Sequence, residues 1–316
     1  MTKDDPRPPV VVVTGPTAAG KTEIALRLAE RFDGEIVNAD SMQVYRYMDI
    51  GTAKPTLAQR ARVPHWLIDV AQPDEAYSAG RYAEEARRAA ARVHARGRPV
   101  FLSGGTGLYV RAMCEGLVGG GGADPSLRER LEREHEAAVA AGDPTRLHRR
   151  LSERDAEAAR LIHPNDLRRV VRALELCARF GEAASRLRGS HGFSDRPYRV
   201  LHLALDPGRE KLDARIDARC AAMIDAGLLR EVRELRQRGF GPELRSMQSI
   251  GYRHMQPVVD GIDTLVNALA AMQRDTRQFA RRQRTWLRGV PEARWLDPED
   301  EDAIFRASEQ FLGARG

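Results

Sequence analysis

The chain has 316 residues, of which 42% are hydrophobic and 30% are charged, with 51 Lys and Arg against 45 Asp and Glu. This length suggests one large domain or two modest ones, and the hydrophobic fraction suffices for a buried core, which excludes global disorder. The three cysteines are too few and too scattered for a disulfide framework or a cysteine-rich zinc site. There is no apolar run of about 20 residues and no signal-peptide core, so we expect a soluble, cytoplasmic protein without membrane contact.

The net charge of +6 is a weak indication of a polyanionic partner. Only four of the basic residues are Lys, and abundant Arg beside abundant Ala can reflect genome composition. The positions of the arginines therefore carry more information than their number. The eight histidines show no metal-ligand spacing, so we interpret them as structural.

The first third of the chain alternates short hydrophobic runs with amphipathic segments. The expected strands are 9–14, 35–40, 66–70 and 99–103, and the expected helices are 22–32 and 77–96, with Ser78 as a cap of the latter. Such alternation predicts a parallel α/β sheet.

The pattern changes after a glycine-rich stretch at 116–122, which is typical of a hinge. The expected elements that follow are helices at 125–141, 144–151, 155–162 and 166–180, a strand at 198–205, helices at 209–238 and about 263–288, and a short strand at 294–296. We therefore predict an α/β core made of residues 1–116 and 197–316, interrupted by an all-helical insertion at 117–196.

A phosphate-binding motif lies between the first strand and the first helix. It fits G-x-x-x-x-G-K-[ST] with Gly15, Pro16, Thr17, Ala18, Ala19, Gly20, Lys21 and Thr22. Backbone N–H groups at a helix N-terminus wrap an anion, Lys21 reaches outer phosphate oxygens, and Thr22 can ligate Mg²⁺. The motif predicts a P-loop NTPase-like core and a bound phosphate or diphosphate, and it does not specify ATP.

Two other strand ends carry polar residues. Asp40 follows the second strand, and ligands of open parallel sheets bind at the carboxyl ends of strands. A carboxylate there can hold Mg²⁺ or accept a proton, or it can simply cap a helix. Thr106, within the Gly-Gly-Thr-Gly run that follows the fourth strand, either reaches the rim of the same crevice or belongs to an ordinary turn.

Arginines form a row near the C-terminus. Arg274, Arg277, Arg281, Arg284 and Arg288 fall three or four residues apart, which places them along one side of a helix. Five aligned guanidinium groups without an interleaved acid suit a phosphate backbone, and the alternative is a solvated helix face. Phe279 and Trp286 lie on another face and are expected to pack inward.

Longer blocks make the sequence recognisable. They are 15–22; Asp40-Ser41-Met42-Gln43-Val44-Tyr45-Arg46; the run 48–55 with Gly51-Thr52-Ala53-Lys54-Pro55; Gly104-Gly105-Thr106-Gly107-Leu108-Tyr109; His163-Pro164-Asn165-Asp166; Gly251-Tyr252-Arg253; and Arg282-Gln283 with Thr285-Trp286-Leu287-Arg288. The chain resembles the tRNA dimethylallyltransferase family, which transfers an isopentenyl group to the adenine beside the anticodon. The Asp-Ser-x-Gln-Val-Tyr and Gly-Thr-Ala-Lys-Pro blocks together are specific to it, whereas a phosphate loop alone is not.

The resemblance implies a reaction. The P-loop would hold the diphosphate of dimethylallyl diphosphate, with Mg²⁺ near Thr22 and Lys21 stabilising the charge on the leaving group. Asp40 would be the general base for adenine N6, and Thr106 would lie on the substrate side of the crevice. Arg215 or Arg219 would assist, and we expect a monomer.

The resemblance also implies a tRNA-binding surface that takes the anticodon stem-loop. The implied residues are Asp40, Ser41, Met42, Gln43, Thr106, Arg128, Arg168, Arg169, Val170, Val171, Arg172, Gln248, Ser249, Ile250, Gly251, Tyr252, Arg253, Arg281, Arg282, Gln283, Arg284, Thr285, Trp286, Leu287 and Arg288. Trp286 or Tyr252 would stack on a base that has left the loop.

Two other functions fit the P-loop. A small-molecule kinase, of the nucleotide or shikimate type, explains the loop and Asp40 but not the arginine row or the insertion. A nucleic-acid-binding NTPase without transfer chemistry predicts RNA-stimulated ATP hydrolysis.

Overall fold

The structure is a computed structural model that describes residues 5–117, 124–181, 183, 185–186 and 195–313. Contacts divide the chain into two compact units, one made of Met1–Cys114 with Pro197–Gly316 and the other of Glu115–Arg196. Most of the glycine stretch at 116–122 lies outside the described residues. Among the described helices, none is both long and apolar enough to cross a membrane.

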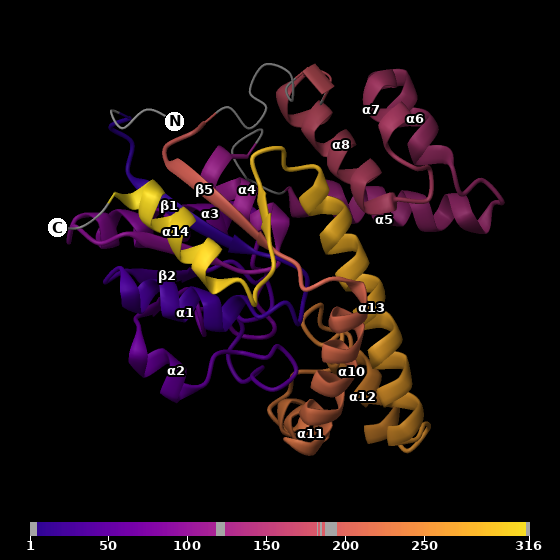
Figure 1. Cartoon of the computed structure of the whole chain (residues 1–316). Coiled ribbons are helices and arrows are strands. Elements are labelled where there is room, and N and C mark those ends of the chain that lie inside the picture. The colour runs from indigo at the N-terminus through magenta and orange to yellow at the C-terminus, as the bar shows by residue number, and fades with distance from the viewer. Residues whose placement is uncertain (1–4, 118–123, 182, 184, 187–194, 314–316) are drawn as a thin grey trace. The chain divides into compact units, whose positions relative to one another are not determined.

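A parallel sheet forms the centre of the first unit (Figure 1). Its strands are β1 (Pro9–Thr14), β2 (Glu35–Asn38), β3 (His65–Trp66), β4 (Val100–Ser103), β5 (Arg199–Leu205) and β6 (Arg294–Leu296), in the order β3-β2-β4-β1-β5-β6. Every pairing is parallel, and β1 lies between β4 and β5. Val10 to Val13 are completely buried because both faces of this central strand are covered, which explains its unbroken β-branched sequence.

Helices cover the sheet and extend beyond it. They are α1 (Lys21–Arg31), α2 (Leu57–Arg62), α3 (Ala79–His94), α4 (Gly107–Glu115), α10 (Arg209–Asp225), α11 (Leu228–Gln237), α12 (Tyr252–Val259), α13 (Leu265–Arg288) and α14 (Glu301–Leu312). Helix α13 packs against α10 and α12, and α11 packs against α12, so these four helices form one group (Figure 1). The α/β class predicted from the sequence is confirmed.

The structure corrects several expected elements. The single helix at 209–238 is wrong: α10 and α11 are separated at Gly227, whose φ of 102° lies in the left-handed region. The strand expected at 66–70 has only two residues, His65 and Trp66. Helices α2, α4, α12 and α14 were not expected, and α2 buries none of its residues, so it lacks the apolar periodicity that reveals a helix in sequence.

The second unit is helical in its described part. It contains α5 (Pro125–Ala140), α6 (Arg146–Arg154), α7 (Ala156–Leu161) and α8 (Leu167–Phe180). Asp124, Asp155 and Asp166 cap α5, α7 and α8 by accepting backbone N–H groups three residues ahead. The helices enclose a core of their own that includes Leu131 and Leu151.

A buried histidine ties β5 to β1 just before the phosphate loop. His202 Nε2 lies 2.7 Å from the Thr14 hydroxyl, and burial lowers the pKa of His202 to about 4. His202 therefore becomes protonated below about pH 6.5 in the unfolded chain but only below about pH 4 in the folded chain.

We expect the free energy of unfolding to fall as pH drops between these values, by up to about 1.4 kcal/mol per unit from this group. Urea unfolding of the wild type and of His202→Asn at pH 7 and pH 4.5 checks this. The variant is expected to lose less stability on acidification, and an equal loss in both proteins would exclude His202 as the cause.

Candidate functional site

The phosphate loop joins the centre of the sheet to the N-terminus of α1. Helix α1 starts at Lys21, and its N-cap Gly20 has a φ of 88°. At Gly15 a Cβ would lie 2.5 Å from the Leu205 carbonyl oxygen, so the loop passes close to the end of β5. The loop therefore leaves β1 in the strand–loop–helix geometry that binds anions.

A pocket of about 270 Å³ opens between the loop and the ends of β2 and β4. Its lining includes Thr17, Ala18, Gly20, Lys21, Thr22, Asn38, Asp40, Gln43, Thr52, Ala53, Gly104, Arg219, Phe279 and Gln283. The structure thus brings together three features that are distant in sequence: the phosphate loop, Asp40 and one of the two arginines expected to assist.

Two cations meet in this pocket. Burial, and then the charge of Arg219, lower the pKa of Lys21 to about 8, against a smaller opposite effect of Asp40. Lys21 Nζ donates to the carbonyl oxygens of Gly15 and Pro16 at 3.1 and 2.8 Å. Burial also lowers the pKa of Arg219, whose Nη1 lies 3.4 Å from the Thr17 hydroxyl. Cations held together with little solvent favour an anionic ligand.

Arg215 takes no part in the pocket. Its Nη2 is 2.8 Å from Glu299 Oε1, in an ion pair on the surface. Of the two arginines expected to assist, only Arg219 is among the residues that line this pocket.

Asp40 forms a tight turn after β2. Its Oδ1 accepts the Met42 N–H at 2.8 Å, and its own N–H donates to Asn38 Oδ1 at 3.2 Å. It does not cap a helix, because the next helix after Asp40 is α2, which begins only at Leu57. The turn holds one carboxylate oxygen and leaves the group on the wall of the pocket.

Thr106 acts on the same turn. Its Oγ1 accepts the Ser41 N–H at 2.9 Å and donates to Ser41 Oγ at 3.2 Å. Thr106 is not among the residues that line the pocket. In the structure Thr106 fixes the residue that follows Asp40.

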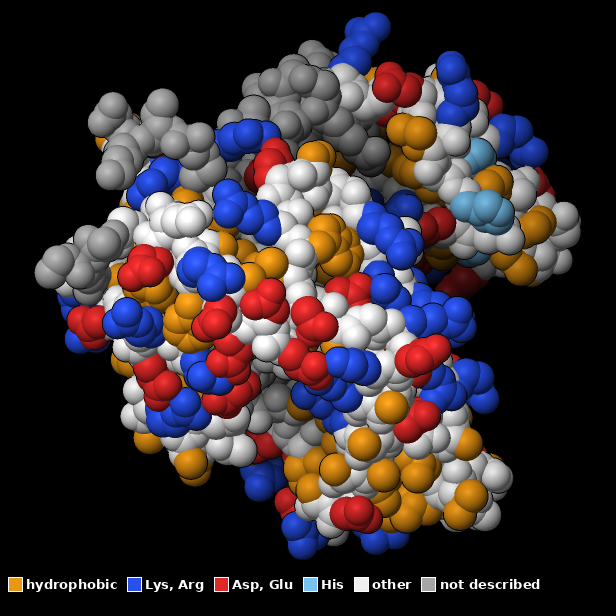
Figure 2. Space-filling model, in the orientation of Figure 1, with side chains coloured by type: hydrophobic (Ala, Val, Ile, Leu, Met, Phe, Trp, Pro, Cys, Tyr) orange, Lys and Arg blue, Asp and Glu red, His pale blue; other side chains and the backbone are white. Residues whose placement is uncertain are grey.

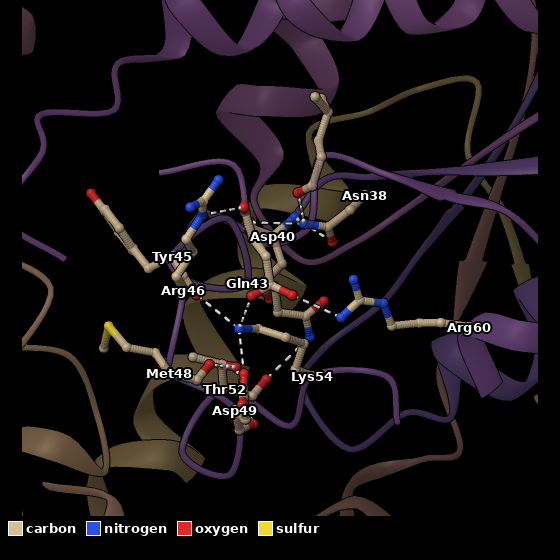
Figure 3. A network of polar contacts seen from close by, with 12 residues as sticks. Asn38, Asp40, Gln43, Tyr45, Arg46, Met48, Asp49, Thr52, Lys54 and Arg60 are labelled. Atoms are coloured by element: carbon tan, nitrogen blue, oxygen red, sulfur yellow. Dashed lines mark hydrogen bonds and ion pairs between the residues drawn. The ribbon is translucent and has the colours of Figure 1, made fainter. Parts of the chain in front are cut away.

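A buried lysine organises the segment after Asp40 (Figure 3). Lys54 Nζ donates to the Tyr45 carbonyl oxygen at 2.8 Å and forms ion pairs with Asp49 and Asp69 at 2.5 and 2.7 Å. Arg60 completes the group through Asp69. The Gly-Thr-Ala-Lys-Pro block is thus explained as the anchor of a long loop on the sheet edge.

Glu231 holds the same loop from α11. Its carboxylate accepts the N–H groups of Asp49, Ile50 and Gly51 at 2.8–3.2 Å and the hydroxyl of Tyr252 at 2.6 Å. Nothing in the spacing around Glu231 sets it apart from other helical glutamates, so its role cannot be read from the sequence.

Three arginines of the α13 row pair with acids, contrary to expectation, and two of these acids lie outside α13. Arg284 pairs with Asp206 at 2.8 Å, Arg277 with Asp217, and Arg274 with its neighbour Asp275 at 3.5 Å. Figure 2 shows blue side chains along much of α13 with red ones among them. Within the described chain, Arg281, Arg282 and Arg288 are exposed and make no ion pair.

Several expected tRNA contacts are corrected by burial. The side chains of Tyr252, Leu287, Val170 and Val171 are at most 4% exposed and belong to the interiors of their own units, and Gly251 and Gln283 are buried as well. Tyr252 therefore does not stack on a base. Trp286 is half-buried against Gly107, where a Cβ would lie 2.3 Å from its ring.

The other expected contacts differ in accessibility. Gln248, Arg253 and Thr285 are exposed, whereas Ser41, Met42, Ser249 and Ile250 are half-buried. In the second unit Arg168 and Arg169 are exposed, and Arg128 and Arg172 both pair with the buried Glu175, at 2.8 and 2.7 Å.

The sheet order, the loop and the pocket at the strand ends define a P-loop α/β protein whose site is built for a phosphorylated ligand. The IPP transferase family profile matches residues 43–290. A tRNA dimethylallyltransferase from Desulfosudis oleivorans is 49% identical over 294 residues, covering 93% of this chain and 92% of that protein. One from Desulfatibacillum aliphaticivorans is 46% identical over 303 residues, covering 96% and 98%.

Solved structures agree. The tRNA isopentenylpyrophosphate transferase of Bacillus halodurans has a TM-score of 0.68 at 37% identity and covers 97% of this chain and 98% of its own. A eukaryotic dimethylallyltransferase acting on tRNA has a TM-score of 0.79 at 29% identity, covering 96% and 77%. The chain belongs to the IPP transferase family, and its P-loop NTPase-like fold is confirmed.

Proposed function

We propose that this protein transfers a dimethylallyl group from dimethylallyl diphosphate to N6 of the adenine adjacent to the anticodon of tRNA. The bond between the allylic carbon and the diphosphate oxygen breaks, a bond from N6 to that carbon forms, and N6 gives up a proton. The observation that carries the proposal is the single pocket in which Lys21 and Arg219 face Asp40. It offers cations for the leaving group and a carboxylate for the proton.

The leaving-group side is the phosphate loop. Negative charge grows on the diphosphate as the allylic bond breaks, and fixed N–H groups, the N-terminus of α1 and Lys21 stabilise charge where it develops. On binding, the diphosphate replaces the Gly15 and Pro16 carbonyl oxygens as the partner of Lys21.

Magnesium fits the oxygen donors of this site. The described residues contain no cluster of three acidic, histidine or cysteine side chains, but Mg²⁺ is commonly held by one or two protein oxygens together with phosphates and waters. Thr22, at the start of α1 in the same pocket, would hold it. The ion would neutralise charge on the diphosphate.

Asp40 is the proposed base. The adenine amine is a poor nucleophile because its lone pair is delocalised into the ring, so removal of its proton as the bond forms lowers the barrier. Hydrogen bonds to the Met42 and Ser41 N–H groups hold the turn and keep the Asp40 carboxylate on the pocket wall. Among the described residues, no lysine or arginine forms an ion pair with this carboxylate.

The RNA side of the proposal uses the exposed arginines of α13 together with residues 117–196 as an RNA-binding insertion. We expect Arg281→Gln with Arg288→Gln to weaken tRNA binding and to reduce the slope of log affinity against log salt by about 1 per lost phosphate contact. Filter binding from 50 to 300 mM salt measures the slope.

Arg92→Gln is the matched control for this prediction. Arg92 is exposed near the C-terminus of α3, at the amino ends of the strands and away from the pocket. Arg92→Gln removes one positive charge, against two in the α13 variant, and is expected to leave the slope unchanged. An unaltered slope in the α13 variant would mean that those arginines form a solvated helix face and do not contact RNA.

The direct test of the function is incubation with labelled dimethylallyl diphosphate, Mg²⁺ and unmodified tRNA, followed by mass analysis of the nucleosides. Prenylated adenosine beside the anticodon supports the proposal. Phosphoryl transfer from ATP to a small acceptor, without prenylation, would favour the kinase alternative. We also propose that the enzyme is a cytoplasmic monomer, which sedimentation and cell fractionation would test.

A further inference from the structure

The two halves of the proposed chemistry lie on separate loops. The diphosphate loop follows β1, and the Asp40 turn follows β2 and contacts the loop after β4. Transfer requires the leaving group, the allylic carbon and the amine to be held in line, and an error of about 1 Å in such an arrangement can cost about 10²-fold in rate. Some contact must therefore fix the distance between the loops.

Gln283 of α13 makes that contact. Its Oε1 accepts the Thr17 N–H of the phosphate loop at 2.8 Å, and its Nε2 donates to the Gly105 carbonyl oxygen at 3.0 Å. The side chain is 8% exposed, so these bonds form with little competition from water. The orientation of the amide is fixed because an N–H needs an acceptor and a carbonyl needs a donor.

The contact between Gln283 and Gly105 is close enough to fix the distance between α13 and the loop after β4. A Cβ at Gly105 would lie 2.3 Å from Gln283 Nε2, so helix α13 rests directly on this loop. The next residue, Thr106, accepts the Ser41 N–H beside Asp40. One line of hydrogen bonds thus runs from the phosphate loop through Gln283 to the turn that carries Asp40.

We propose that Gln283 is a positioning residue that sets the separation between the diphosphate loop and Asp40. This rests on the proposed function and replaces the expectation that Gln283 contacts tRNA. The helix that carries Gln283 also exposes Arg281 and Arg282, so the same helix that offers charge to RNA braces the reacting loops.

The test uses Gln283→Met, which keeps the length of the side chain and removes both hydrogen bonds. With donor and tRNA saturating, we expect the single-turnover rate to fall about 10- to 100-fold. Affinity for tRNA and its salt slope are expected to stay at wild-type values, because the side chain is buried. Gln278→Met, at an exposed position of the same helix, is the matched control and is expected to retain the wild-type rate.

A second variant, Gln283→Asn, keeps the test valid if Gln283→Met does not fold. Gln283→Asn keeps the amide but is one methylene too short to reach both loops, and we expect the same loss of rate. In an Asp40→Asn background the effect of Gln283→Met is expected to shrink, because the distance it sets no longer places a base. A purely structural residue would lower the rate equally in both backgrounds.

The inference is overturned by a wild-type rate in Gln283→Met, by full additivity with Asp40→Asn, or by a changed salt slope that reveals an RNA contact. The proposed function fails separately, if the wild-type enzyme itself forms no prenylated tRNA.

Discussion

Asp40→Asn is expected to lower the rate of prenyl transfer by about 10²–10⁴-fold, the usual contribution of a general base. Asparagine is the informative replacement because its Oδ1 can still accept the Met42 N–H that forms the turn. The loss should therefore come from the missing proton acceptor and not from a displaced loop. Single-turnover assays with donor and tRNA saturating isolate that step.

Binding provides the control for this variant. Affinity for inorganic pyrophosphate and for tRNA is expected to remain near that of the wild type, since the P-loop and α13 are untouched. Asp40→Ala, which also loses the Met42 bond, should be no more active than Asp40→Asn. A wild-type transfer rate in Asp40→Asn would remove Asp40 as the base.

Lys21→Ala is expected to produce the second large loss, about 10²–10³-fold in rate, because it removes a cation from the developing charge on the diphosphate. It should weaken pyrophosphate binding much more than tRNA binding. The reverse order would contradict the assignment of the loop. Thermal unfolding of the variant controls for a change in the α1 N-terminus.

The pH dependence gives Lys21 a signature of its own. With a pKa of about 8 in the free protein, Lys21 is largely neutral at pH 9, and a bound diphosphate restores its charge. Pyrophosphate affinity should then fall as pH rises above 8, and binding at pH 9 should take up about one proton. Calorimetry in buffers of different ionisation enthalpy measures that uptake.

Lys21→Arg should abolish this dependence because a guanidinium stays charged throughout the range. Persistence of the full proton uptake in Lys21→Arg would assign it to another group.

Local patterns predicted much of the fold. The β-branched run of β1, the Gly-Lys-Thr motif and the Ser78 cap are signals that a few adjacent residues carry, and the structure contains each of them. Helix α2 left no such signal because it buries nothing. The break at Gly227 was missed because a glycine between two amphipathic stretches is also compatible with one continuous helix.

The site was predictable in part for a related reason. A motif names the residue types a loop requires, so the phosphate loop and Asp40 could be placed at one edge of the sheet. The partners of the arginine row were hidden, since Asp206 and Asp217 lie some 60 to 80 residues before their arginines in the chain. Gln283 was predicted to contact RNA because it lies in a sequence block with Arg282, Trp286 and Arg288. Its position on the helix instead directs its side chain inward, to the two loops.

The most direct measurement of the central claim is a crystal structure with Mg²⁺ and a donor analogue whose bridging oxygen is replaced by sulfur, so that it binds without reacting. We predict that the diphosphate lies against the N–H groups of residues 18–22 and the ammonium of Lys21, with the allylic carbon directed toward Asp40. A diphosphate bound elsewhere, for example at Arg60 beside Asp69, would contradict the account.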